Sequence, residues 1–147
     1  MSTIKVLCTS LFFFACSAFA GSKEDAVQVV ERWAKAFTEA DVETIASLYA
    51  PEAVFIGTDG KAILVQPEEI KKYFQGVLLG TRRFVATLLE SKVTAASETA
   101  VVITAFDKLA ITADGKTQDA FGRVTFVVAK RDSSWKIVSF HRSRMPS

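Results

Sequence analysis

The chain has 147 residues, with 18 lysines and arginines against 16 aspartates and glutamates, which gives a formal net charge of +2. This balance lacks the basic excess typical of nucleic-acid binding, so we expect no nucleic-acid partner. The single histidine and two cysteines supply too few ligands for an ordinary zinc site. We therefore expect neither a bound metal nor a cofactor, and the length indicates one domain.

Residues 1–20 have the pattern of a secretory signal peptide. Lys5 precedes a short apolar stretch, and Ala18-Phe19-Ala20 matches the small-x-small pattern that signal peptidase cleaves. The stretch is shorter than the roughly 20 residues that a membrane-spanning helix needs. We predict cleavage after Ala20, a single mature domain of residues 21–147, and a periplasmic or secreted protein without a membrane span. An uncleaved anchor and lipoprotein processing at Cys16 are the alternatives.

Three amphipathic helices are predicted in the first half of the mature chain. Asp41 is a good N-cap for a short second helix, which Pro51 ends. The third begins at Pro67, because proline suits the first helical position and the glutamates that follow suit the positive end of the helix dipole. Gly80 ends it. The first helix is indicated by apolar residues at helical spacing, namely Ala26, Val30, Trp33 and Phe37.

The rest of the chain has the pattern of strands. A first strand at 53–57 and a short return strand at 62–65 flank a turn with the sequence Thr-Asp-Gly. Four long strands follow, and strands of this length are expected to bend. We predict an α+β fold in which a curved antiparallel sheet forms a cone, with the three helices packed in its concave face. The long strands are expected at 83–93, 99–113, 117–131 and 135–144.

Three stretches carry a resemblance to a known family: SLYAPEAV at 47–54, QPEEIKKYF at 66–74, and RVTFV at 123–127 followed by WKIV at 135–138. With this order of elements, the chain resembles the nuclear transport factor 2-like superfamily. Within it, the chain is similar to bacterial proteins related to the association (hub) domain of calcium/calmodulin-dependent protein kinase II and to the SgcJ/EcaC group. The resemblance implies a cystatin-like cone over about residues 23–146. The fold hosts enzymes, adaptors and oligomerisation modules, so it implies no single activity.

Arg123 is the first candidate for binding a ligand. It lies in an alternating run whose same-face neighbours are largely apolar, so we expect it to point into the cone. A buried arginine needs an anion, which a ligand could supply. The resemblance implies the same role, because Arg123 matches a pocket arginine of the hub domain by position. The alternative is an internal salt bridge to Asp107 or Asp119.

The last strand and the helices supply further candidate ligand-binding residues. His141 and Arg142 point to opposite faces of that strand, and the sequence leaves open which of them faces the cone. Trp33, Phe37 and Tyr49 are expected to line the cone, either as a ligand cage or as ordinary core.

Catalysis would need a carboxylate or a histidine as general base. Enzymes of the ketosteroid isomerase and SnoaL-like cyclase kind, to which the fold is similar, carry an acid at the end of the first strand, where this chain has Gly57. Asp107, Asp119 and His141 are the remaining candidate bases, although a structural histidine is the alternative for His141. The missing acid favours a protein that is not an enzyme.

These features lead to one predicted function with two alternatives. We expect a secreted domain that binds a small anionic or amphipathic molecule in its cone without catalysis. The two central strands carry apolar residues on both faces, for example Phe106 and Phe121, and helices can cover only one face. We therefore expect self-association into a homodimer or a larger ring. The alternatives are an isomerase, cyclase or dehydratase, and a purely structural oligomerisation module.

Overall fold

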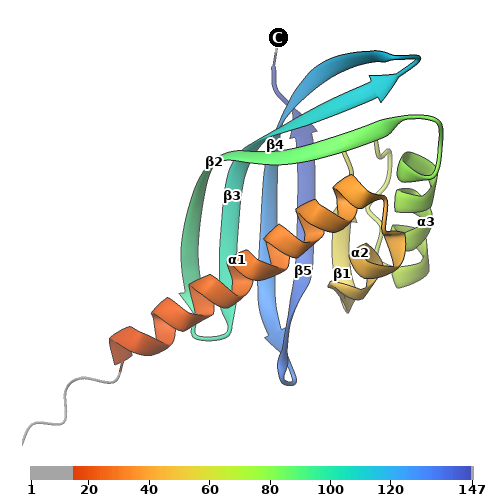
Figure 1. Ribbon diagram of the computed structural model, residues 1–147. Helices are drawn as coiled ribbons and strands as arrows, with labels where there is room; N and C mark the ends of the chain where they lie inside the picture. Colours follow the sequence, from red (N-terminus) through yellow and green to blue (C-terminus); the bar gives the residue numbers. More distant parts are fainter. Residues whose placement is uncertain (1–14, 147) are drawn as a thin grey trace, which may run out of the picture.

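The computed structural model describes residues 15–146, with side chains from Gly21 onward (Figure 1). Most of the predicted signal peptide, residues 1–14, lies outside the described residues. The α+β order predicted from the sequence is confirmed. The helices are α1 (Ala15–Glu39), α2 (Val42–Ser47) and α3 (Pro67–Leu78), and the strands are β1 (Tyr49–Ile56), β2 (Arg83–Ser97), β3 (Ala100–Ala113), β4 (Lys116–Arg131) and β5 (Ser134–Arg144).

The ends of the helices follow from local side-chain chemistry. The Asp41 carboxylate accepts the backbone N–H of Thr44 at 3.0 Å and so caps α2, as predicted. The Thr44 hydroxyl also donates to this carboxylate at 2.6 Å, and this bond, together with the one from the backbone, lowers the pKa of Asp41. At α3 the backbone N–H of Gln66 donates to the Glu69 carboxylate at 3.4 Å. Among the described helices, none is long and apolar enough to cross a bilayer.

The five strands form one curved sheet in the order β1-β5-β4-β3-β2. Strands β2 to β5 are antiparallel, but β1 pairs in parallel with β5, placing Phe55 beside Phe140. The curved sheet is therefore antiparallel, as predicted, except where β1 pairs in parallel with β5. The predicted return strand is reduced to a single bridge between Phe55 and Leu64. In Figure 1, α1 crosses the concave face of the sheet, while α2 and α3 lie beside β1.

Trp33 lies at the centre of the core between α1 and the sheet. Its ring centroid is 5.3 Å from those of both Phe126 in β4 and Phe140 in β5, and 6.1 Å from that of Phe74 in α3. Its indole N–H donates to the Tyr49 hydroxyl at 3.1 Å, which satisfies the polar atoms of both rings inside the core. The edge-to-face arrangement of several of these rings adds to the stabilisation from their burial.

The central rings set the stability of the domain. Phe126 is fully buried, so Phe126→Ala should lower the free energy of unfolding by about 3–5 kcal/mol through the cavity it leaves. Ile63→Ala is the control, because that side chain is 62% exposed and its loss should change stability by less than about 0.5 kcal/mol. Urea denaturation followed by tryptophan fluorescence measures both. Equal losses would contradict the assignment of this core.

Candidate functional site

A cavity of about 230 Å³ lies between α1, α3 and the concave face of the sheet. Aromatic and aliphatic side chains form most of its wall. Such a predominantly apolar hollow with a few polar groups is typical of small-molecule sites, although its volume falls slightly below their usual range. The apolar wall comprises Trp33, Phe37, Phe55, Phe74, Val77, Phe84, Leu109, Ile111, Ala120 and Phe140.

The polar residues of the lining come from four segments. Thr58 and Asp59 lie in the turn after β1, and Tyr73 comes from α3. Three arginines complete the set: Arg82 lies just before β2, and Arg142 and Arg144 lie near the end of β5. These arginines differ sharply in how far their charges are already neutralised.

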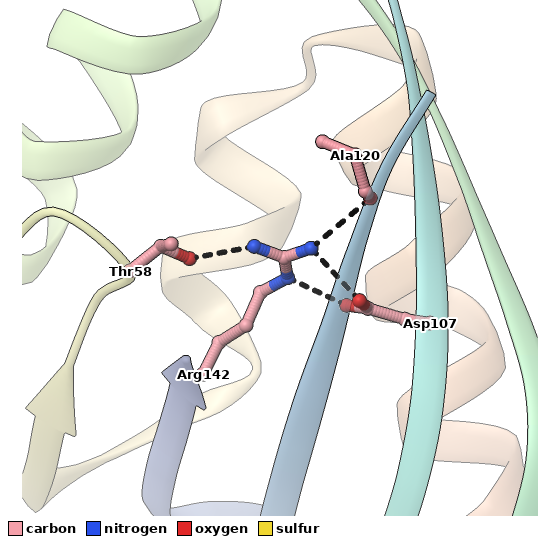
Figure 2. Close-up of polar contacts among 4 residues, drawn as sticks. All are labelled: Thr58, Asp107, Ala120 and Arg142. Carbon is pink, nitrogen blue, oxygen red and sulfur yellow. Dashed lines mark hydrogen bonds and ion pairs between the residues drawn. The ribbon is translucent and has the colours of Figure 1, made fainter. Parts of the chain in front are cut away.

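Arg142 is held in a buried ion pair. Its Nε and Nη2 donate to the two oxygens of Asp107 at 2.7 and 2.8 Å, and both residues are about 95% buried, with exposed fractions of 6% and 5%. Nη1 donates to the Thr58 hydroxyl at 2.8 Å and Nη2 to the Ala120 carbonyl at 3.5 Å. Figure 2 shows the guanidinium between Thr58 on one side and Asp107 and Ala120 on the other. Arg142 thus ties β3, β4 and β5 to the turn after β1.

Gly122 makes this ion pair possible. Strand β4 separates β3 from β5, so the side chains of Asp107 and Arg142 must meet across it. Gly122 is the β4 residue opposite Asp107, and a Cβ atom there would lie 2.5 Å from both the Asp107 carboxylate and the guanidinium. A glycine inside a strand often marks such a close approach.

The other two arginines lie at the solvent-exposed end of the cavity. Arg144 donates to both oxygens of Asp59 at 2.7 and 2.9 Å, and this partner raises the pKa of Arg144. Arg82 lies over the Phe84 ring at 5.5 Å and has no carboxylate partner among the described residues. Three arginines thus face two carboxylates, Asp59 and Asp107. The resulting excess of one positive charge resides on Arg82.

Tyr73 provides a neutral polar group at the same end. Burial raises the pKa of its phenol, and the nearby Asp59 carboxylate raises it further, while Arg142 and the backbone of Thr58 act weakly in the opposite direction. The hydroxyl therefore stays protonated at neutral pH. Its ring lies against Gly57, where a Cβ atom would be 2.3 Å from the hydroxyl oxygen. This phenol thus fills the space beside Gly57, the position at which the resemblance to ketosteroid isomerase-like enzymes implied that an acid would be needed.

Four of the residues expected from the sequence lie at or behind the cavity. Trp33, Phe37 and Arg142 line it, and both rings are also part of the core. Tyr49 is buried behind Trp33 and its pKa is raised well above the usual value by that burial. Trp33 and Phe37 are therefore core residues that also line the cavity, and their role in holding a ligand stays a prediction.

Arg123, Asp119 and His141 lie on the opposite, outer face of the sheet, and each is exposed. Arg123 donates to the Arg144 carbonyl at 3.4 Å, and Asp119 pairs with Lys108 at 3.4 Å. The expected inward orientation of Arg123 is wrong, because its apolar same-face neighbours belong to an exposed apolar surface. Neither expected salt bridge from Arg123 forms. The candidate bases Asp119 and His141 therefore have no access to the cavity from where they lie. The third candidate, Asp107, is held in the buried ion pair with Arg142.

Several site residues were missed by the sequence reasoning. Tyr73 lies in the third predicted helix and Thr58 in the predicted turn after the first strand, but neither pattern indicates a residue that lines a cavity. The pairing of Asp107 with Arg142 was not foreseen, although Gly122 inside a predicted strand signals a close approach there. Within residues 15–146, no group of three histidines, cysteines or acids is placed to hold a metal ion.

The SnoaL-like domain family matches residues 26–147. The chain belongs to this family. Among solved structures, it is similar to a candidate calcium/calmodulin-dependent protein kinase II association domain from Xanthomonas campestris, with 27% identity, a TM-score of 0.75, and 82% of this chain and 86% of that chain covered. No curated protein matches the chain.

Two further solved structures that are similar to this chain are named after different activities. A candidate dehydratase of the NTF2-like family from Streptomyces avermitilis has 15% identity and a TM-score of 0.79, covering 87% of this chain and 99% of that chain. A ketosteroid isomerase-like protein from Erwinia carotovora has 18% identity and a TM-score of 0.74, and the match covers 86% of this chain and 98% of that chain. At these identities the likeness shows the NTF2-like fold, with a mixed sheet and helices in the N-terminal half.

The buried and exposed arginines of β5 should behave differently on removal. Arg142→Ala leaves the Asp107 carboxylate buried without a partner, which should lower the free energy of unfolding by about 3–5 kcal/mol. Arg144→Ala, two residues along on the same face, breaks only an exposed pair and should leave stability within experimental error. Chemical denaturation of both variants tests this, and equal effects would contradict the structural role given to Arg142.

Proposed function

We propose that this SnoaL-like domain binds a small, largely apolar molecule that carries an anionic group, and that it does so without chemical turnover. The observation that carries the proposal is Arg82, an unpaired cation at the open end of a cavity with apolar walls. A flat apolar body suits the aromatic wall. An anionic group, such as a carboxylate, suits the guanidinium.

The charges of the site explain why the anchor is Arg82 and not its neighbours. Arg142 makes four hydrogen bonds to protein atoms, so most of its five N–H groups are used. Arg144 already holds a carboxylate. An anion that approaches Arg82 meets a cation that no protein carboxylate neutralises. Binding there does not require an existing ion pair to break.

Self-association through the outer sheet face is part of the proposal. That face carries four exposed apolar side chains around a shallow hollow, namely Leu89, Phe106, Phe121 and Met145, with exposed fractions of 41–50%. Helix α1 covers only the concave face, so this patch remains open to water (Figure 1). A second copy of the chain would bury it, giving a homodimer or a larger ring.

Secretion is proposed from the leader sequence. The signal-peptide pattern of residues 1–20 would direct the domain to the periplasm or the exterior, where the ligand would be encountered.

A second candidate function is an isomerase, cyclase or dehydratase. The observation that favours it is Asp59, the carboxylate in the cavity lining, which lies near Tyr73. Against it stands the ion pair of Asp59 with Arg144, in which both carboxylate oxygens already accept hydrogen bonds. A purely structural module is supported less, because it predicts a filled cone instead of a cavity of about 230 Å³.

Arg82 and Arg83 form a matched pair for testing the binding proposal. With 4-isopropylbenzoate as probe, Arg82→Ala should weaken binding roughly tenfold, because a charge-assisted hydrogen bond is lost. Arg83→Ala should leave the dissociation constant unchanged, since Arg83 contacts backbone carbonyls outside the cavity. The dissociation constant of the neutral 4-isopropylbenzamide should be unchanged by either substitution. Isothermal titration calorimetry measures these constants, and absence of carboxylate binding to the wild type would refute the proposal.

The association state can be tested separately by native mass spectrometry. The wild type should be a dimer or a larger ring, and Phe121→Glu should shift it to monomer, because a charge would be placed within the apolar patch. Ile63→Glu is the control, since Ile63 is also apolar and exposed but lies outside the sheet face. A monomeric wild type would rule out self-association, and a Phe121→Glu oligomer would place the interface elsewhere.

A further inference from the structure

The phenol of Tyr73 is a fixed polar group in an otherwise aromatic part of the cavity. Its ring packs edge-on against Phe55, with centroids 4.8 Å apart, and against Phe74, with centroids 5.4 Å apart. These contacts set the position of the ring from two sides. The hydroxyl is therefore held in place and does not depend on a flexible side chain for its position.

Gly57 fixes the position of the hydroxyl itself. A Cβ atom at residue 57 would lie 2.3 Å from both the hydroxyl oxygen and the ring carbon that bears it, so only glycine leaves room for the phenol. The Gly57 carbonyl accepts the N–H of Gly60 at 3.0 Å, which holds this turn against the end of β1. The phenol thus occupies a space that the backbone keeps free of side chains.

The hydroxyl proton is available to a ligand. A tyrosine hydroxyl can donate one hydrogen bond, and no acceptor for the Tyr73 proton lies within hydrogen-bond distance in residues 15–146. Every fully buried polar side-chain atom in that part of the chain does have a partner. The hydroxyl oxygen interacts with the backbone of Thr58, but its own proton has no protein acceptor there and can be donated into the space that Tyr73 lines.

We propose that Tyr73 determines ligand specificity by donating a hydrogen bond to a neutral carbonyl oxygen of the bound molecule. This inference rests on the proposed function and narrows the ligand class to aromatic or alicyclic acids that carry a ketone, with the carboxylate at Arg82 and the ketone at Tyr73. A second carboxylate is disfavoured at this position, because the Asp59 carboxylate is close enough to act on the phenol. A neutral acceptor meets no such repulsion.

Matched pairs of ligands isolate the hydrogen bond. 4-Acetylbenzoate and 4-isopropylbenzoate have similar shapes, but only the first has a carbonyl oxygen on its substituent. A second pair, 3-acetylbenzoate and 3-isopropylbenzoate, places that substituent at another distance from the carboxylate. For the full chain, at least one keto acid should bind about three- to tenfold more tightly than its isopropyl partner, as expected for one net hydrogen bond. Tyr73→Phe should abolish this preference without changing the affinity for the isopropyl acids.

Two further variants separate this role from a structural one. Gly57→Ala should reduce the preference as Tyr73→Phe does, because the added methyl group displaces the hydroxyl. Tyr49→Phe removes the chain's other phenolic hydroxyl, which lies behind the cavity wall, and should retain the preference. Equal affinities within both pairs for the wild type, or a preference that survives Tyr73→Phe, would overturn the inference and leave carboxylate binding intact. Absence of binding by all four acids would overturn the proposed function and this inference together.

Discussion

The buried ion pair between Arg142 and Asp107 organises the polar end of this domain. Removing two charges from water is costly, and the cost is offset here by short hydrogen bonds that use both carboxylate oxygens. The same guanidinium binds Thr58, which fixes the turn that carries Gly57 and Asp59. The positions of Tyr73 and of the exposed Asp59–Arg144 pair thus follow from one buried contact. Without it, the cavity would lose its polar end.

Some residues of the cavity wall also belong to the core that stabilises the fold. Trp33 and Phe37 stabilise the fold by packing against other rings, yet they also form the wall that a ligand would touch. An apolar wall built from rings held by their neighbours needs little reorganisation when a ligand binds, which reduces the entropic cost of binding. The polar groups lie at one end of the cavity, and Arg82 and Tyr73 are the two on which the proposed binding depends.

Local signals made much of the fold predictable from the sequence. The caps at Asp41 and Pro67 and the long alternating strands depend on neighbours along the chain, and their elements lie where they were expected. The sequence did not predict which face of β4 is turned toward the core, because both faces carry apolar residues. The two-residue period therefore cannot tell the exposed Phe121 from the buried Phe126. Arg123 was placed inward for this reason. The partner of Arg142 is 35 residues away in the chain, and no local pattern encodes that contact.

The pairing of the first strand with the last has a consequence for synthesis. Tyr49 of β1 lies opposite Ile137 of β5, and β5 also supplies Phe140 and Arg142 to the cavity. While the chain is still being synthesised, β1 has no strand to pair with and the cavity lacks the wall that β5 provides. Contacts this distant in sequence slow folding and leave apolar surface exposed in the interval. We expect the nascent chain to depend on holding chaperones until its final strand is released.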